Sequence, residues 1–220
     1  MHAVGIVAAA GSGLRLGAEL PKALVPLAGR PLVCWAVDSL RAGGVAEVVV
    51  TVPPAQRAAF AAVLPPEIHL VDGGSTRTAS VRAGLDGATA AADVVLVHDA
   101  ARPLTPPDVI RRVLAALAAG HPAVVPVLPV VDTTVVVDEE AVVTEALPRA
   151  TLRRVQTPQG FDRVTLTAAY AALDADADLT DDAAVVRAAG IPVITVDGDE
   201  RAGKVTVAHD LVLAEMQVRA

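Results

Sequence analysis

The sequence is poor in cysteine, in aromatic residues and in net positive charge, and each shortage excludes a class of protein. A single cysteine among 220 residues excludes an intramolecular disulfide framework and a zinc site built on cysteines. Aromatic residues make up only 2% of the chain, which excludes the stacking platforms that bind single-stranded nucleic acid. The net charge of -7 has the wrong sign for a general DNA or RNA binder, so an anion site must be a local cluster of Arg and Lys.

Long apolar runs are also missing. The longest uncharged window, residues 113–131, contains three prolines, so it predicts a helix end, a turn and a strand rather than a membrane span. No basic segment precedes the first apolar run, which argues against a signal peptide. Cys34 lies in the apolar run 32–35, which is typical of a buried small hydrophobe and not of a nucleophile. We therefore expect a cytoplasmic protein that binds neither nucleic acid nor membrane.

What the chain does contain is a regular alternation of apolar segments. Apolar residues make up 53% and charged residues 20%, which excludes disorder, and the length suffices for one α/β domain with a sizeable core. The pattern predicts an α/β fold of Rossmann-like type, with three layers and a mostly parallel central sheet. We expect strands over 4–9, 47–52, 68–71, 94–97 and 123–128, and helices over 31–42, 55–64, 76–91 and 106–119.

The alternation breaks between residues 130 and 161. Segments 133–137 and 141–144 predict a hairpin, and 151–156 predicts a further strand. Because an isolated hairpin is marginal in water, we expect this arm, residues 132–156, to pack on a partner subunit. The rest of the chain predicts helices over 163–173 and 181–189, a strand over 191–196 and a final helix from about 209, all within a single domain over 1–220.

A glycine loop that carries two positive charges follows the first strand. It reads Ala9-Ala10-Gly11-Ser12-Gly13-Leu14-Arg15-Leu16-Gly17 and continues to Pro21-Lys22. Glycines let backbone N–H groups approach phosphate oxygens, and Arg15 and Lys22 supply the charge that a triphosphate needs. The loop lacks the Gly-Lys-Ser/Thr of a Walker loop and the glycine spacing of a dinucleotide fingerprint. The alternative is an ordinary strand-to-helix turn with two surface cations, but the two charges favour phosphate binding.

Two further segments lie where ligands bind in parallel sheets, beyond the carboxyl ends of strands. The segment from Gly73 to Ser80 either caps a helix or offers contacts to a base edge, and capping is the simpler interpretation. His98-Asp99-Ala100-Ala101-Arg102-Pro103 places Asp99 where Mg²⁺ could bridge phosphate oxygens and Arg102 where it could hold a second anion. The alternative is that Asp99 caps a turn beside a solvated Arg102. His98 is typical of a structural residue at a strand end, not of a base.

Together the segments resemble a known family. The first loop, with Leu27-x-Gly29-x-Pro31-Leu32, is similar to the signature of nucleotidyltransferases. Five further motifs narrow the resemblance to one family of nucleotidyltransferases. They are Gly73-Gly74-x-x-Arg77-x-x-Ser80-Val81, His98-Asp99-Ala100-Ala101-Arg102-Pro103, Thr157-Pro158-Gln159, Thr180-Asp181 and Lys204-Val205-Thr206. With these the chain resembles the 2-C-methyl-D-erythritol 4-phosphate cytidylyltransferases, the IspD family, over nearly its whole length.

The resemblance implies a nucleotidyltransferase fold and a Mg²⁺-dependent reaction in which the acceptor phosphate attacks the α-phosphorus of CTP in line and pyrophosphate leaves. It assigns catalysis to Arg15, Lys22 and Lys204, and the metal to Asp99. It assigns nucleotide binding to Ala9, Ala10, Gly11, Ser12, Gly13, Gly74, Ser80 and Ala100. It assigns the acceptor, a polyol phosphate, to Arg102, Thr133, Arg149, Thr180 and Thr206. Thr133 and Arg149 lie in the arm, which implies a homodimer whose arms reach the partner's site.

The chain departs from the family pattern around Lys204. Relatives usually have Asn-Ile before this lysine, where this chain has Ala202-Gly203, so a second metal-facing carboxylate at Asp199 or Glu200 stays open. Two other functions stay open as well. One is a cytidylyltransferase for another polyol phosphate such as ribitol 5-phosphate, whose members tend to carry Val where Ala101 stands. The other is a non-catalytic nucleotide-binding module, against which the joint presence of two cations and Asp99 argues.

Overall fold

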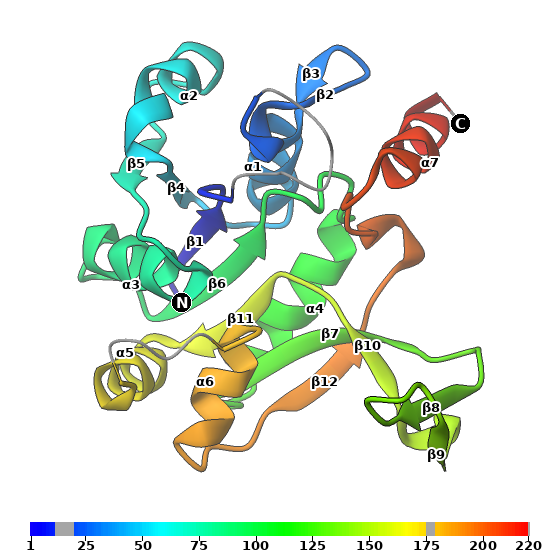
Figure 1. Ribbon diagram of the computed structural model, residues 1–220. Coiled ribbons are helices and arrows are strands. Elements are labelled where there is room, and N and C mark those ends of the chain that lie inside the picture. Colours follow the sequence, from blue (N-terminus) through cyan, green and yellow to red (C-terminus); the bar gives the residue numbers. More distant parts are fainter. Residues whose placement is uncertain (12–19, 175–178, 220) are drawn as a thin grey trace.

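Strands of a central sheet alternate with helices along the chain (Figure 1). The computed structural model describes residues 1–11, 20–174 and 179–219. The sheet strands are β1 (Ala3–Ala8), β4 (Glu47–Val52), β5 (His69–Asp72), β6 (Val94–Asp99), β7 (Ala123–Pro129), β10 (Arg153–Val155), β11 (Gln159–Asp162) and β12 (Ile194–Asp197). The helices are α1 (Leu32–Ala42), α2 (Arg57–Val63), α3 (Arg77–Gly87), α4 (Pro107–Ala118), α5 (Arg163–Ala172), α6 (Asp182–Ala188) and α7 (Ala208–Arg219).

The sheet is mostly parallel, as the sequence predicts. Its strand order is β10-β7-β11-β6-β1-β4-β5, and β12 also pairs with β7. The four strands β6, β1, β4 and β5 are parallel neighbours, and β12 is parallel to β7. β10 and β11 run antiparallel to β7, so the sheet reverses direction only on this side. The carboxyl ends of β1, β5 and β6 consequently open on the same edge.

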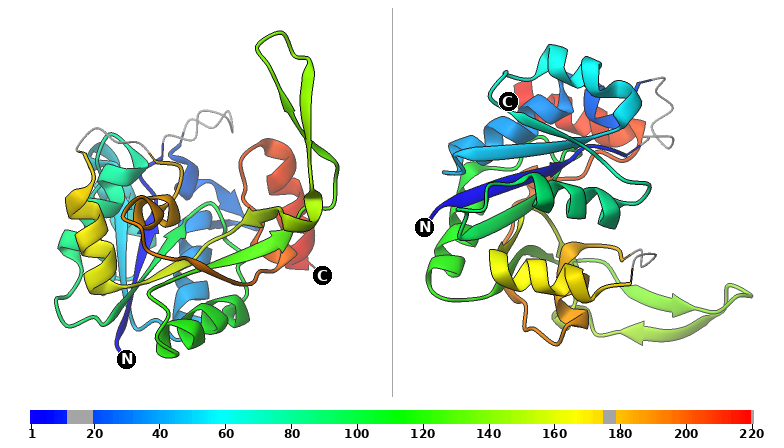
Figure 2. Two further views of the ribbon diagram at one scale, coloured as in Figure 1. Left: turned by 90° about the horizontal axis from the view of Figure 1, so that it is seen from below. Right: turned by 90° about the vertical axis from the view of Figure 1, so that its left-hand side faces the viewer.

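Helices cover both faces of the sheet, which gives the three layers that the sequence predicts (Figure 2). In β1, Ala3 and Val7 belong to one core cluster, and Val4 and Ile6 belong to the other. The first cluster packs against α1, α2 and α4, and the second packs against α3, α5 and α6. Burial of each aliphatic side chain stabilises the folded state by about 1.5–3 kcal/mol. Strands that are apolar on both faces are therefore stable only between two layers of helices.

A hairpin of β8 (Thr134–Val137) and β9 (Val143–Leu147) projects away from the body of the molecule (Figure 2). The predicted second strand, 141–144, is wrong in its bounds. The carboxylate of Asp138 accepts the N–H groups of Glu140 and Val142 at 3.1 and 2.8 Å, so the turn extends to residue 142. The apolar and polar residues of 141–147 alternate too weakly to place this boundary from the sequence.

Four other predicted boundaries change in the structure. The helix predicted over 76–91 ends at Gly87, because Thr89 donates its N–H to the Glu47 carboxylate at 3.0 Å and its carbonyl accepts from Arg163. The helix predicted over 55–64 begins with a 3-10 turn at 54–56, and the strand predicted over 191–196 lies at 194–197. The strand expected at 151–156 shortens to β10, and β11 was not predicted. Among the described residues, no helix has the length and apolar character that a membrane span requires.

Candidate active site

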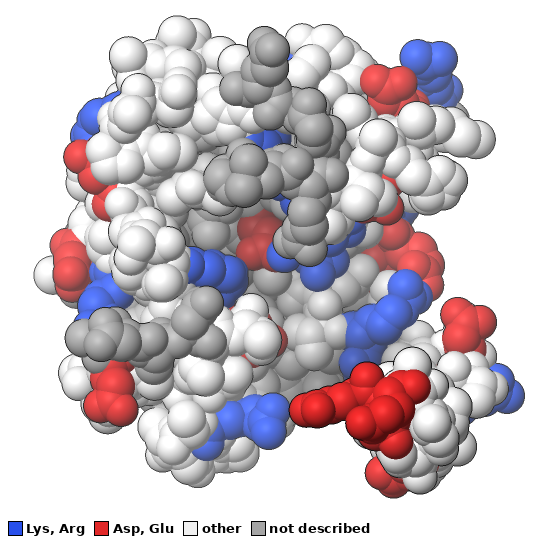
Figure 3. All heavy atoms as spheres, in the orientation of Figure 1, with Lys and Arg blue, Asp and Glu red and all other residues white. Residues whose placement is uncertain are grey.

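A cavity of about 570 Å³ opens at the carboxyl ends of β1, β5 and β6, where ligands bind in parallel α/β sheets. Figure 3 shows acidic and basic side chains gathered around a hollow near the centre of this face. The cavity is lined by Ala8, Ala9, Ala10, Gly11, Lys22, Ala23, Gly74, Ser75, Thr76, Arg77, Ser80, Asp99, Ala100, Ala101, Lys204 and Thr206. Three segments that the sequence singles out, and the distant Lys204 segment, therefore meet in one place.

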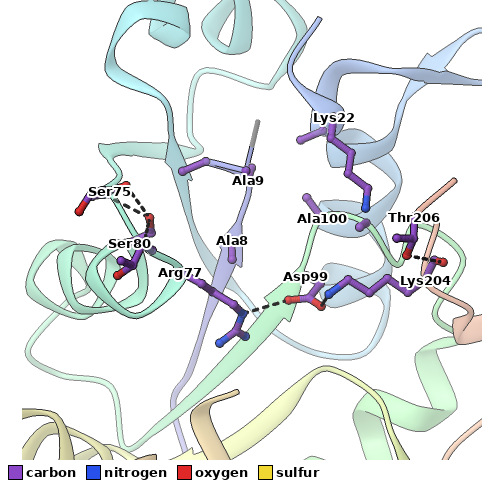
Figure 4. Close-up of a pocket in the computed structure, with 16 residues that line it drawn as sticks. Ala8, Ala9, Lys22, Ser75, Arg77, Ser80, Asp99, Ala100, Lys204 and Thr206 are labelled. Atoms are coloured by element: carbon purple, nitrogen blue, oxygen red, sulfur yellow. Dashed lines mark hydrogen bonds and ion pairs between the residues drawn. The ribbon is translucent and has the colours of Figure 1, made fainter. Parts of the chain in front are cut away.

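Asp99 lies at the end of β6 and is surrounded by cationic side chains (Figure 4). Its carboxylate accepts from Lys204 Nζ at 2.8 Å and from Arg77 Nε at 3.4 Å, and Arg102 Nε lies 3.9 Å away. Burial alone would raise the pKa of Asp99, but the charges of Arg77 and Lys204 hold this pKa well below its ordinary value. The group is therefore a permanent anion that holds cations from distant segments at the bottom of the pocket.

Arg77 lines the pocket, although the sequence predicted no role for it. It begins α3, and its Nη2 donates to the fully buried carboxylate of Asp182 at 2.6 Å. The hydroxyl of Tyr170 donates to the same carboxylate at 2.6 Å. Burial by itself would lower the pKa of Arg77, but Asp182 and Asp99 raise it, so the guanidinium stays charged. The available signal was an arginine shortly after the glycine pair of a predicted strand-to-helix loop.

The glycine loop reaches the pocket at both of its described ends. Ala9 and Gly11 line the cavity, and the N–H of Ala9 donates to the Thr51 carbonyl at 3.0 Å, which continues the β1–β4 ladder. Lys22 opens a 3-10 turn, Lys22–Leu24, and Figure 4 shows its ammonium group pointing into the pocket toward Ala100. The predicted residues Ser12, Gly13 and Arg15 lie outside the described residues.

Lysine occurs only twice in this chain, at Lys22 and Lys204, against sixteen arginines. Both lysines line the cavity. An ammonium is a compact point charge that can move with a shifting phosphate, whereas a guanidinium fixes its partner in a rigid fork. Both lysine ammonium groups of the chain therefore lie at the pocket.

The start of α3 combines helix capping with an open pocket wall. The Thr76 hydroxyl accepts the N–H of Ala79 at 3.0 Å, so the capping interpretation is confirmed for this residue. Ser80 Oγ donates to the Thr76 carbonyl at 2.8 Å and accepts the N–H of Gly74 at 3.1 Å. A Cβ at Gly74 would lie 2.4 Å from the Cβ of Ala79, so only glycine allows this approach. The backbone at Gly74 thus faces the cavity while Ser80 holds it in place.

The five predicted acceptor residues occupy different positions. Thr206 lines the pocket. Arg102 does not, because its guanidinium donates to the carbonyls of Ala202 at 2.8 Å and Val155 at 3.2 Å. Thr180, Thr133 and Arg149 are exposed, and the last two lie at the base of the arm, outside the pocket of their own chain. Arg149 donates to the Val131 carbonyl at 2.9 Å.

His98 and Thr157 lie next to Asp99 outside the pocket lining, and Thr157 forms hydrogen bonds with both His98 and Asp99. His98 is fully buried, its Nδ1 lies 2.8 Å from Thr157 Oγ1, and burial lowers its pKa to about 4. Thr157 Oγ1 also accepts the N–H of Asp99 at 3.0 Å. His98 does not line the cavity, which agrees with the structural role expected for it. Thr157 and Gln159 are buried polar residues whose contacts the sequence did not indicate.

Asp99 is the one carboxylate among the residues that line the described part of the pocket. Asp199 is paired with Arg201 at 2.8 Å and Glu200 with Arg154 at 2.6 Å, and neither lines the cavity. The described residues contain no cluster of three groups that could hold a metal without a substrate. This donor set still fits Mg²⁺, which is commonly bound by one or two carboxylates together with substrate phosphates.

Comparison with known proteins gives a consistent result. Residues 3–220 match the family described as 2-C-methyl-D-erythritol 4-phosphate cytidylyltransferase, IspD. A protein of this name from Nocardia farcinica is 53% identical over 215 residues, which cover 96% of this chain and 92% of that protein. Another from Saccharopolyspora erythraea is 50% identical and covers 98% of both chains. The crystal structure of the Thermus thermophilus protein of the same name is similar over the full length of both chains, with 39% identity and a TM-score of 0.83.

Proposed function

The chain belongs to the 2-C-methyl-D-erythritol 4-phosphate cytidylyltransferase family, and on that premise we propose how the residues of its pocket divide the work. The protein transfers the CMP moiety of CTP to 2-C-methyl-D-erythritol 4-phosphate. The products are 4-diphosphocytidyl-2-C-methyl-D-erythritol and pyrophosphate. The observation that carries the assignment is the meeting of Lys22, Lys204 and Asp99, from distant segments, in a single cavity.

The chemistry joins two polyanions, so positioning and charge neutralisation dominate it. An oxygen of the acceptor phosphate forms a bond to the α-phosphorus, and the bond from that phosphorus to the bridging oxygen of pyrophosphate breaks. Lys22 and Lys204 stabilise the negative charge that grows on the α-phosphate and on the leaving group, with Arg15 assigned to the same role. We assign the triphosphate to Ala9, Ala10 and Gly11, together with Ser12 and Gly13. The N–H of Ala9 is taken by the Thr51 carbonyl, so among the described residues the backbone N–H groups of Ala10 and Gly11 are assigned to the phosphates.

Asp99, together with the phosphates of CTP, would hold the Mg²⁺ that we propose for this reaction. The ion supplies neutralisation of the triphosphate charge when it is bound. The permanently ionised carboxylate of Asp99 supports this role, because Mg²⁺ prefers charged oxygen ligands. In the structure Lys204 Nζ donates to the Asp99 carboxylate at 2.8 Å. When the substrates bind, Lys204 exchanges this carboxylate for a substrate phosphate.

A pyrophosphate-release assay tests the function directly. CTP and Mg²⁺ are offered with 2-C-methyl-D-erythritol 4-phosphate, with ribitol 5-phosphate, or with no acceptor. We expect pyrophosphate only with the first acceptor, because a specific pocket must hold the attacking phosphate in line. Release with ribitol 5-phosphate at a higher kcat/KM would move the assignment to the other polyol phosphate, and equal values would contradict the specificity expected here. Binding of CTP without release would indicate a nucleotide-binding module.

The base pocket yields a prediction about UTP. We assign the cytosine to Gly74 and Ser80 and the ribose to Ala100. Backbone groups that pair with the 4-amino donor of cytosine would face an oxygen in uracil, which leaves a buried acceptor unpaired at a cost of about 1–3 kcal/mol. We expect kcat/KM for UTP to be about 10- to 100-fold below that for CTP. Equal turnover of the two nucleotides would remove Gly74 and Ser80 from base recognition.

The arm supports a homodimer. Val136, Val137, Val142 and Val143 are exposed on the hairpin of a single chain, and covering them in a partner subunit would remove this apolar surface from water. Thr133 and Arg149 at the base of the arm do not line the pocket of their own chain, so their assigned role requires the partner's site.

The single, buried cysteine supports a reducing compartment, for which we propose the cytoplasm.

Mixed dimers test the arm assignment. Arg149→Ala is expected to raise KM for the acceptor about 10- to 100-fold, the loss of a charged hydrogen bond, with little change in KM for CTP. A mixed dimer of an Arg149→Ala chain with a Lys22→Ala chain would contain one intact site, built from Lys22 of the first and Arg149 of the second. Activity should therefore reappear when the two impaired proteins are co-expressed. Absence of complementation in a verified mixed dimer would place Arg149 at its own subunit's site.

A further inference from the structure

Lys204 is held on a segment without regular secondary structure. It follows a 3-10 turn, Glu200–Ala202, and precedes α7. The N–H of Val205 donates to the Ala101 carbonyl at 2.8 Å, which fixes the segment just after the lysine. The position of the Lys204 ammonium against Asp99 therefore also depends on what holds the turn before it.

The side chain of Gln156 holds that turn at both ends. Its Oε1 accepts the N–H of Asp199 at 3.0 Å, and its Nε2 donates to the Asp199 carbonyl at 2.8 Å and to the Ala202 carbonyl at 3.4 Å. Gln156 is buried, so these groups have no water to replace their partners. Arg102 donates to the same Ala202 carbonyl at 2.8 Å. The turn that leads to Lys204 is thus fixed by a buried amide and a mostly buried guanidinium.

The fold is shaped around this amide. A Cβ at Gly198 would lie 2.2 Å from Gln156 Oε1, so the residue before the turn must be glycine for Gln156 to occupy its place. The backbone N–H of Gln156 donates to the Pro126 carbonyl at 2.8 Å, which anchors the residue on β7. The carbonyl of the neighbouring Val155 accepts from Arg102 at 3.2 Å.

Gln156 also stands where the arm returns to the sheet. β10 ends at Val155 opposite Val127, and β11 is in register again with Gly160 opposite Val124. Between these two pairs the segment from Val155 to Gly160 advances by five residues, whereas β7 advances by three. The strand formed by β10 and β11 therefore bulges between Val155 and Gly160. The bulge breaks the ladder directly after Gln156.

We propose that Gln156 is a positioning residue for catalysis, which holds the 199–203 turn so that Lys204 reaches Asp99 and the reacting phosphates. This inference rests on the function proposed above for Lys204. Gln156 does not line the pocket, so we assign its effect to the backbone of Asp199 and Ala202, with which it forms hydrogen bonds. The arm, the bulge and the catalytic lysine are thereby joined through one buried amide.

The test uses Gln156→Met, which keeps the length of the side chain and removes its three hydrogen bonds. We expect kcat to fall about 10- to 100-fold, the scale of a catalytic group misplaced by about an ångström, with KM for CTP nearly unchanged. Arg154→Gln is the matched control, since it removes an exposed ion pair to Glu200 of the same turn and should leave kcat within about twofold. Thermal unfolding of each variant is measured alongside.

A second readout reports Lys204 itself. Lys22 is the other lysine of the chain, so it serves as an internal reference in labelling with an amine-selective acylating reagent, read by mass spectrometry. Loss of the Gln156 hydrogen bonds should raise the labelling of Lys204 relative to Lys22, and Arg154→Gln should not. A general loosening of the fold would instead raise both and would count against the proposal.

A double-mutant cycle separates the possible outcomes. In a Lys204→Ala background, Gln156→Met should cause no further loss of kcat, because its effect passes through the lysine. Equal losses in both backgrounds, or no loss at all, would overturn the proposal. A Lys204→Ala variant with unchanged kcat would instead contradict the function assigned to Lys204. If Gln156→Met does not fold, the same cycle is run with Gly198→Ala, whose methyl group displaces the Gln156 amide.

Discussion

Replacement of Lys22 by alanine is expected to lower kcat about 10²–10³-fold or more, the effect of removing one charged contact to a transition state. The lysine lines the pocket and points its ammonium toward Ala100, above the Asp99–Lys204 pair (Figure 4). The charge on the α-phosphate and on the departing pyrophosphate grows during the reaction, so the loss should appear in kcat more than in the KM for CTP. Steady-state pyrophosphate release at saturating substrates provides the measurement.

Lys22→Arg is the control for this prediction. It keeps the positive charge but replaces a point charge by a planar fork, so we expect an activity between those of Lys22→Ala and the parent. A further check is protection from an amine-selective reagent, since CTP should shield both lysines of the chain at once. A Lys22→Ala enzyme within about threefold of the parent kcat would contradict the catalytic role, because transition-state contacts of this kind have far larger effects.

Asp99→Asn is expected to lower kcat by a similar factor of about 10²–10³, through the loss of the carboxylate assigned to Mg²⁺. The asparagine keeps the shape of the side chain, and Arg77 keeps its partner Asp182 at 2.6 Å, so the variant should remain folded. The dependence of rate on Mg²⁺ concentration is the decisive measurement. The parent should saturate, and the variant should need a higher concentration without regaining the parent's kcat.

Asp72→Asn is the matched control for Asp99→Asn. Asp72 also ends a parallel strand, β5, but it is exposed and paired with Arg57 at 2.8 Å outside the pocket lining. Removing one exposed charge there should leave the Mg²⁺ dependence and kcat within about twofold of the parent. If both variants behaved alike, the carboxylate of Asp99 would have no special part in metal binding.

Local signals in the sequence were sufficient for much of the architecture. The strand at 47–52 and the helix at 106–119 were predictable within a residue or two, because continuous apolar runs and amphipathic spacing are local properties. Strand β11 was not, since it is short and its neighbours β6 and β7 supply all its pairing. The turn at Asp138 was predicted in the right place but too short, because two hydrogen bonds of one carboxylate set its length.

The residues of the candidate site also fall into two groups, those that could be predicted from the sequence and those that could not. Gly11, Gly74, Lys22 and Asp99 were found because each occupies a distinctive segment that follows a predicted strand, whereas Lys204 was assigned only through the resemblance. Arg77 and Gln156 were not assigned roles, because an arginine or a glutamine has no local signature of burial. Their significance lies in the partners that the fold supplies, the carboxylates of Asp99 and Asp182 for Arg77 and the 199–203 turn for Gln156.

The amino-acid sequence by itself determined a parallel α/β sheet, an acidic chain with locally gathered cations, and the family of the protein. Only the tertiary structure decided which charges neutralise one another and which residues hold them in place. The reason is physical: periodicity and chain charge depend on neighbours along the chain, whereas the 2.8 Å contact of Lys204 with Asp99 joins residues 105 positions apart. Contacts of that kind form only when packing brings the ends of the strands together.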